Sequence, residues 1–298
     1  MNRLPSGPSF AVLCGVSVLL WFRPLLNTFA LASGSDRYTH IFLIIPVTAA
    51  LIIQGWRVQG WRERAFEPRF WTPAIGLLFV ALLIAAWARW GNFEGKSDLA
   101  LTIEMIALVL WWIGSFALCY GPHTLRAFRF PLLFLLWMVP IPARAVDWIV
   151  AGLQQGSAIA AQILFATFRV PVARDGTILQ IPGLTLEVAV ECSSIRSSLM
   201  LLVTTMVLAQ VLLKTGWRKG LIILLAIPLS VAKNGLRIFT IGMLGTRVDP
   251  SYLTGRLHHN GGIVFFLIAL VMIFLLLWFL QRSERGLASA PQLSPARP

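Results

Sequence analysis

Long apolar runs separated by short polar connections dominate the chain. A helix needs about 20 mostly apolar residues to cross a bilayer. By that measure we predict spans at 10–31, 38–54, 72–90, 99–120, 126–141, 199–213, 220–245 and 262–280. The run at 126–141 is short and ends in the helix-breaking sequence Pro140-Ile141-Pro142. The pattern therefore predicts an all-α polytopic membrane protein with about eight transmembrane helices.

The segment 142–198 departs from this pattern. Its first part, 146–168, is apolar but contains Asp147 and three glutamines, so we expect an interfacial or re-entrant helix and not a ninth span. Beyond it the hydrophobic period changes to two, which indicates strands at 177–181 and 184–191 joined at Pro182-Gly183. We expect a small β-hairpin that leads into the apolar span near 199.

Composition excludes a soluble globular enzyme, because 57% of residues are hydrophobic and only 12% are charged. The net charge of +13 does not indicate nucleic acid, since the cations lie between apolar runs. Cytoplasmic loops accumulate Lys and Arg. Cations cluster at 55–71, 126–129, 214–219 and 281–298. Both termini are therefore predicted to be cytoplasmic, and 142–198 and 246–261 extracytoplasmic. We expect one integral-membrane domain, 1–280, followed by a disordered cytoplasmic tail, 281–298.

Cys192 lies at the junction between the predicted hairpin and the helix that follows it, between Glu191 and Arg196. Serines follow it directly, and serine is a good helix N-cap. A helix N-terminus and a nearby arginine both stabilise a thiolate, so this position favours a low thiol pKa and a nucleophilic cysteine. The alternative, an inert buried cysteine, suits Cys14 and Cys119, which lie within apolar runs.

Lys233, Asn234 and Arg237 interrupt the apolar span 220–245. Cations within a span are costly and usually functional, although snorkelling to the interface is the alternative. The spacing of four places Lys233 and Arg237 on one helix face, which predicts a polar stripe facing the bundle. Glu104, in an earlier span, is a candidate partner for Lys233 or Arg237, with a purely structural ion pair as the alternative.

His258 and His259 precede the last span on the predicted outer side. A histidine near a cysteine in space is the arrangement of a general base and a nucleophile, whereas most loop histidines are only solvated. The cysteines lack zinc-ligand spacing and no glycine-rich phosphate loop is present, so we expect no metal and no cofactor.

These motifs resemble the exosortase/archaeosortase family of membrane cysteine transpeptidases. The similarity covers about 38–280 and is strongest at 187–197 around Cys192, 228–238 around Arg237, and 258–266 around His258. The order cysteine, arginine, histidine also agrees. The family commonly has Ser-Gly after the cysteine, whereas this chain has Ser193-Ser194. His258 fits the family spacing to Gly262, with His259 as the alternative.

The resemblance implies that Cys192 is the nucleophile, Arg237 the oxyanion stabiliser and His258 the general acid/base, with support from Arg196, Glu191, Asn234, Lys233, His259 or Glu104. Substrates would be exported proteins with a C-terminal tail made of a short motif such as Pro-Glu-Pro, a transmembrane helix and a basic cluster. The protein would act, in association with exopolysaccharide export, on the extracytoplasmic side of the bacterial inner membrane, through a thioacyl intermediate. The acceptor nucleophile would be a lipid, a glycan or water, and the sequence does not distinguish these three.

Two other functions fit the residues. A polytopic transporter of an anion or a lipid-linked sugar would line its path with Lys233, Arg237 and Glu104 and would not depend on Cys192. A noncatalytic assembly component for envelope polysaccharide would tolerate substitution at every proposed catalytic position.

Overall fold

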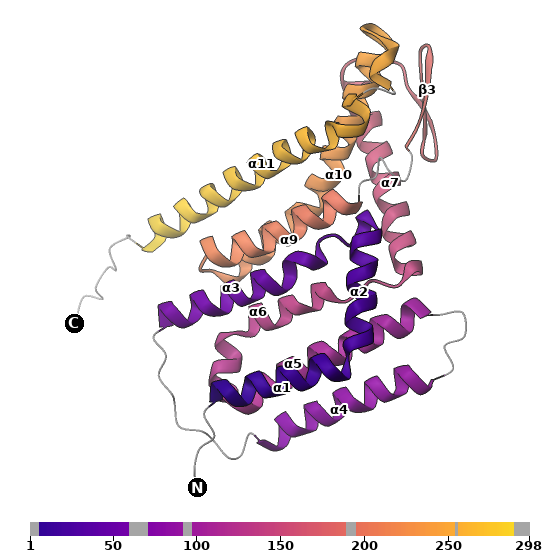
Figure 1. The fold of residues 1–298 in the computed structure, drawn as a ribbon. Coiled ribbons are helices and arrows are strands. Elements are labelled where there is room, and N and C mark those ends of the chain that lie inside the picture. The colour runs from indigo at the N-terminus through magenta and orange to yellow at the C-terminus, as the bar shows by residue number, and fades with distance from the viewer. Residues whose placement is uncertain (1–5, 60–70, 92–96, 189–194, 254–255, 289–298) are drawn as a thin grey trace, which may run out of the picture. The chain divides into compact units, whose positions relative to one another are not determined.

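The computed structural model describes residues 6–59, 71–91, 97–188, 195–253 and 256–288, with the backbone alone at 6, 59, 256–261 and 286–288. The chain divides into two compact units, Met1–Val146 and Asp147–Pro298. Helices dominate both units, and a small antiparallel sheet belongs to the second (Figure 1).

Helices of the first unit begin with α1 (Ser6–Leu20) and α2 (Phe22–Gly34), which meet at a bend of 75°. The 3-10 turn η1 (Asp36–Tyr38), α3 (Ile41–Gln59), α4 (Trp71–Trp90) and α5 (Ser97–Ala127) follow. Figure 1 shows α4 and α5 side by side, and they share the largest helix contact of the unit. Near its end α5 is interrupted at Gly121, whose φ of 78° is non-helical, directly before Pro122.

The second unit contains α9 (Ile195–Leu212), α10 (Gly216–Arg247), the 3-10 turn η4 (Pro250–Leu253) and α11 (Arg256–Ala288). These three long helices pack together around an apolar core (Figure 1). The core includes Leu201 of α9, Ile222 of α10 and Ile273 of α11, all fully buried.

Among the described residues, seven helices are long and apolar enough to cross a membrane, or eight if α1 and α2 form one bent span. This count confirms the all-α polytopic fold. The predicted span at 126–141 is wrong, because the chain there forms the short helix α6 (Arg129–Phe134) and the 3-10 turn η3 (Leu135–Met138). Pro140 and Pro142 prevent continuation of this helix.

The segment expected at the interface forms α7 (Ala143–Thr167), a helix of 25 residues that meets the length and composition of a span. These criteria do not support the interfacial placement. If α1 and α2 form one span, the total of eight stays the same, with α7 in place of 126–141 as the fifth candidate crossing. Its glutamines explain the misleading polarity: Gln154 donates to the Val188 carbonyl at 2.9 Å, and Gln162 accepts from Arg174 at 2.9 Å. These polar side chains bind the sheet.

The predicted hairpin is confirmed in β2 (Ile178–Ile181) and β3 (Leu184–Glu187), which pair antiparallel through a turn at Pro182-Gly183. Gly183 has φ of 80°, a value that glycine adopts without steric cost. A further strand, β1 (Ala173–Asp175), was not predicted and pairs with the other side of β2. The expected alternation holds, since Leu179 and Ile181 are buried and Thr185 and Glu187 exposed.

The apolar face of this sheet packs on α7 and α10. Leu179, Phe165 and Ile238 belong to one buried cluster that joins the three elements. Gly242 of α10 allows the close approach, because a Cβ there would lie 2.8 Å from Leu186 Cδ1. The packing fixes β3 alongside the half of α10 that carries the predicted polar stripe.

Candidate functional site around Arg237

Three polar side chains lie buried in the middle of α10. Lys233 is 6% exposed, Asn234 1% and Arg237 8%. Because Lys233 and Arg237 are four residues apart, they occupy one face of the helix. The prediction of a polar stripe that faces the protein interior is confirmed, and the snorkelling alternative does not fit burial of this degree.

The first turn of α9 is held against this stripe by two serines. Lys233 Nζ donates to Ser197 Oγ, and Ser230 Oγ donates to Ser198 Oγ at 2.6 Å. Helix α9 begins at Ile195, so these contacts hold the chain that directly follows the predicted nucleophile segment. Sequence reasoning did not assign a role to these serines, because isolated serines in apolar helices have no distinctive pattern.

The chain on the other side of the nucleophile segment is held by β3 and Val188. Val188 is buried; its N–H donates to the Thr177 carbonyl at 3.0 Å, and its carbonyl accepts from Gln154 Nε2 at 2.9 Å. Strand β3 thereby reaches α10 at the level of Arg237 and Ile241, while α9 contacts α10 at the level of Ser230 and Lys233.

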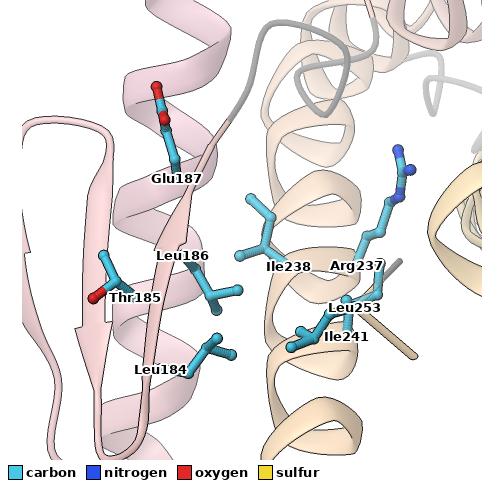
Figure 2. Close-up of a pocket in the computed structure, with 8 residues that line it drawn as sticks. All are labelled: Leu184, Thr185, Leu186, Glu187, Arg237, Ile238, Ile241 and Leu253. Atoms are coloured by element: carbon cyan, nitrogen blue, oxygen red, sulfur yellow. The ribbon is translucent and has the colours of Figure 1, made fainter. Parts of the chain in front are cut away.

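A cavity of about 170 Å³ lies between β3 and α10. Its lining is mostly aliphatic, and Arg237 is the single cation among the described residues that line it. Figure 2 shows Arg237 and Glu187 toward one end and Leu184, Ile241 and Leu253 toward the other. A guanidinium beside an apolar space of this kind can hold a negatively charged or carbonyl oxygen away from bulk water, where the interaction is stronger than in solution.

Helix α11 contributes Gly262, which lies beside the Arg237 guanidinium. A Cβ at Gly262 would be 3.9 Å from Arg237 Nη1, which is ordinary van der Waals distance. His258 and His259 lie in the first turn of the same helix, because α11 begins at Arg256. The segment expected as a polar connector is therefore the start of the last helix. The structure describes the backbone alone at these two histidines.

Cys192 and Glu191 lie outside the described residues, as do Ser193 and Ser194. Arg196 is in the first turn of α9 and is exposed. The segments that flank Cys192 on both sides are thus described, but the cysteine itself is not.

Glu104 forms its ion pair with Arg89, at 3.4 Å between Oε1 and Nε. Arg89 is not among the partners that the sequence suggested for Glu104. Arg89 also donates to the Leu20 carbonyl at 2.6 Å, so this pair ties α1, α4 and α5 together.

Within the part of the chain that the structure describes, no group of three His, Cys, Asp or Glu side chains is arranged to hold a metal ion. The described polar residues that line the cavity are Thr185, Glu187 and Arg237. Lys233, one turn before Arg237 on α10, binds Ser197 Oγ.

A family model described as transmembrane exosortase matches residues 21–275 of the chain. No curated protein and no solved structure gives a significant match. The matched region includes every segment around Arg237 described above and well over half of the chain. The protein therefore belongs to the transmembrane exosortase family.

Proposed function

We propose that this exosortase is a membrane cysteine transpeptidase in which Cys192, Arg237 and His258 form the catalytic group. One observation carries the proposal. The three segments adjacent in sequence to Cys192 and His258, namely β3, the first turn of α9 and Gly262 of α11, meet at one stretch of α10, which bears Lys233 and Arg237.

Chain connectivity supports a short distance between Cys192 and Arg237. Cys192 is three residues before Ile195, so their Cα atoms can be at most about 11 Å apart. Ile195 begins the turn whose Ser197 binds Lys233, one helical turn before Arg237. A cysteine tied to that turn is well placed to reach the cavity beside Arg237.

The helical register of α11 favours His258 over His259. Gly262 contacts Arg237, and a helix turns by about 100° per residue. His258, four positions earlier, is therefore rotated by about 40° from Gly262, and His259 by about 60°. His258 is thus the histidine closer to the direction of Arg237.

In the proposed reaction the Cys192 thiolate attacks the scissile carbonyl carbon of the substrate. Arg237 stabilises the oxyanion of the tetrahedral intermediate with its guanidinium N–H groups. His258 accepts the thiol proton and returns it to the leaving amine, which departs with the transmembrane tail. The thioacyl enzyme then passes the protein to an acceptor nucleophile from lipid, glycan or water, and the thiol is restored.

The family acts on exported proteins that carry sorting signals. For this chain we propose tails composed of a short motif, a transmembrane helix and a basic cluster. A tail helix halted in the membrane would present its motif at the outer interface of the bacterial inner membrane. With α7 as the fifth crossing, the basic loop 214–219 stays cytoplasmic and the β1–β3 sheet extracytoplasmic.

This orientation is testable by labelling with a membrane-impermeant thiol reagent. In a variant without native cysteines, a cysteine introduced at Gly176, in the turn between β1 and β2, should be labelled from outside intact spheroplasts. A cysteine at Thr215, between α9 and α10, should be labelled only after lysis. The reverse pattern would contradict the orientation.

The function is tested by coexpressing a tail-bearing reporter from the native host with the wild-type protein or with Cys192→Ala. Wild type should shorten the reporter, and Cys192→Ala should leave it full length. Cys14→Ala and Cys119→Ala are matched controls, since these cysteines lie in α1 and α5, and both should process normally. Equal processing by wild type and Cys192→Ala would contradict the proposal.

A further inference from the structure

Strand β3 is an edge strand of the sheet, whose order is β1-β2-β3. The two-residue turn makes Ile181 and Leu184 a hydrogen-bonded pair, and pairs of this type alternate along the ladder. Val188 continues the alternation by donating to Thr177. The backbone groups of Leu184 and Leu186 therefore point toward β2, and those of Thr185 and Glu187 point away from it.

No backbone partner from the described residues is assigned to the outward groups of Thr185 and Glu187. These two N–H and two C=O groups form a short row with the spacing that another strand requires. Edge strands with such a row commonly bind an extended peptide as an additional strand.

The same two residues border the cavity beside Arg237. Figure 2 shows the side chains of Leu184 and Leu186 directed toward α10 and those of Thr185 and Glu187 directed away from it. Thr185, Glu187 and Arg237 line the same cavity. The edge strand and the guanidinium therefore border one space.

The cavity has the size and polarity to hold one side chain. An apolar cavity of about 150 Å³ can take up a benzene-sized group, and this one measures about 170 Å³. Leu186, Ile241 and Leu253 supply an aliphatic wall. Leu253 reaches the cavity because Gly245 leaves it room: a Cβ there would be 2.5 Å from Leu253 Cγ.

We propose that the substrate tail binds to β3 as a fourth strand, in extended conformation, directly before its transmembrane helix. One apolar side chain of the peptide enters the cavity. The peptide backbone next to that side chain reaches Arg237, at the polar end of the cavity. Strand β3 continues in sequence toward Cys192, so a peptide aligned with it is guided toward the nucleophile. This inference rests on the proposed function and specifies how that site recognises its substrate.

The direct test is a backbone N-methyl scan of a synthetic tail peptide, measured as affinity for purified Cys192→Ala protein. Strand addition predicts a period of two: methylation at alternate positions should weaken binding roughly two- to tenfold per lost hydrogen bond, while the positions between are tolerated. A flat profile, or equal losses at consecutive positions, would overturn the inference. If wild-type protein cleaves the tail but the N-methyl profile is flat, strand addition is contradicted and the proposed function is not. If the tail is neither bound nor cleaved, both strand addition and the proposed function are contradicted.

A variant pair tests the protein side. Thr185→Pro removes the outward N–H and leaves the ladder to β2 intact, since proline is tolerated at edge positions. Thr185→Val alters the side chain but keeps the N–H. The tail peptide should bind Thr185→Pro roughly two- to tenfold more weakly than Thr185→Val, with equal melting temperatures. Equal affinity of the two variants for the peptide would contradict strand addition. If Thr185→Pro does not fold, the N-methyl scan still tests strand addition, because it uses a protein whose β3 is unaltered.

Discussion

Gly262 of α11 lies against the guanidinium of Arg237 of α10, with 3.9 Å between Arg237 Nη1 and the position of a Cβ at residue 262. The second turn of α11 therefore lies beside the buried cation, and the predicted histidine is one turn earlier on that helix. A side chain larger than alanine at position 262 would need space that the guanidinium occupies.

Substitution of Gly262 by a large residue should displace Arg237. Gly262→Ala adds only a methyl group at ordinary contact distance and should retain most activity. Gly262→Leu should lower the rate of reporter processing by about 100-fold, the order of loss expected when a catalytic group shifts by about 1 Å. Processing rates are compared at equal protein amounts in the membrane. Similar rates in the two variants would show that the guanidinium position does not matter.

Arg237 should contribute more to the rate of reporter processing than to the free energy of unfolding. Arg237→Ala is expected to slow processing by about 10²–10³-fold, as for loss of an oxyanion donor. Arg237→Lys should retain only part of the wild-type processing rate, because lysine lacks the planar set of N–H donors of a guanidinium.

Arg218 is the matched control, being a second buried arginine on α10. It donates to the Leu280 carbonyl at 2.9 Å and to Ser283 Oγ at 3.2 Å, so its role is structural. Arg218→Ala should lower the melting temperature while the rate per folded molecule stays near wild type. A larger rate loss at Arg218 than at Arg237 would refute this assignment.

The Lys233–Ser197 contact should stabilise the junction between α9 and α10. Ser197→Ala removes an acceptor from a buried ammonium, so the free energy of unfolding should fall by about 1–3 kcal/mol. Lys233→Met removes the charge that needs the acceptor. In a double-mutant cycle, Ser197→Ala should therefore cost much less in the Lys233→Met background. Additive losses would mean that the two side chains do not interact.

Close packing of α7 on α10 depends on Gly235. A Cβ there would lie 2.5 Å from Ala160 Cβ, so Gly235→Ala should destabilise the protein by about 1–3 kcal/mol through overpacking. Gly220, on the same helix, has open space around it, and Gly220→Ala should be neutral or stabilising by up to about 1 kcal/mol. Thermal unfolding of both purified variants measures the difference; equal melting temperatures would contradict close packing at Gly235.

The sequence could predict features whose cause is local. Alternating hydrophobicity around Pro182-Gly183 was enough to predict the hairpin, and spacing alone indicated that Lys233 and Arg237 share a face. Strand β1 was missed because all three of its residues are exposed, so it has no alternating pattern.

Features that depend on tertiary partners could not be predicted in this way. Helix α7 has the length and composition of a span, but its glutamines favoured an interfacial helix in the sequence. In the structure Gln154 binds the Val188 carbonyl and Gln162 binds Arg174 of β1, partners that the sequence pattern does not reveal. The partner that Glu104 has in the structure, Arg89 of the neighbouring helix α4, is no more conspicuous in the sequence than the other cations. The serines that hold α9 to α10 became apparent only when the helices were seen together.

The central claim is that Cys192 becomes acylated by the substrate. Purified protein should be mixed with a tail peptide, quenched with acid within the first turnover, and digested for mass spectrometry. The account predicts that the peptide containing Cys192 gains the mass of the N-terminal substrate fragment, that hydroxylamine removes this mass, and that Cys192→Ala shows none. Cleavage of the tail with no adduct at Cys192 at any quench time would contradict it.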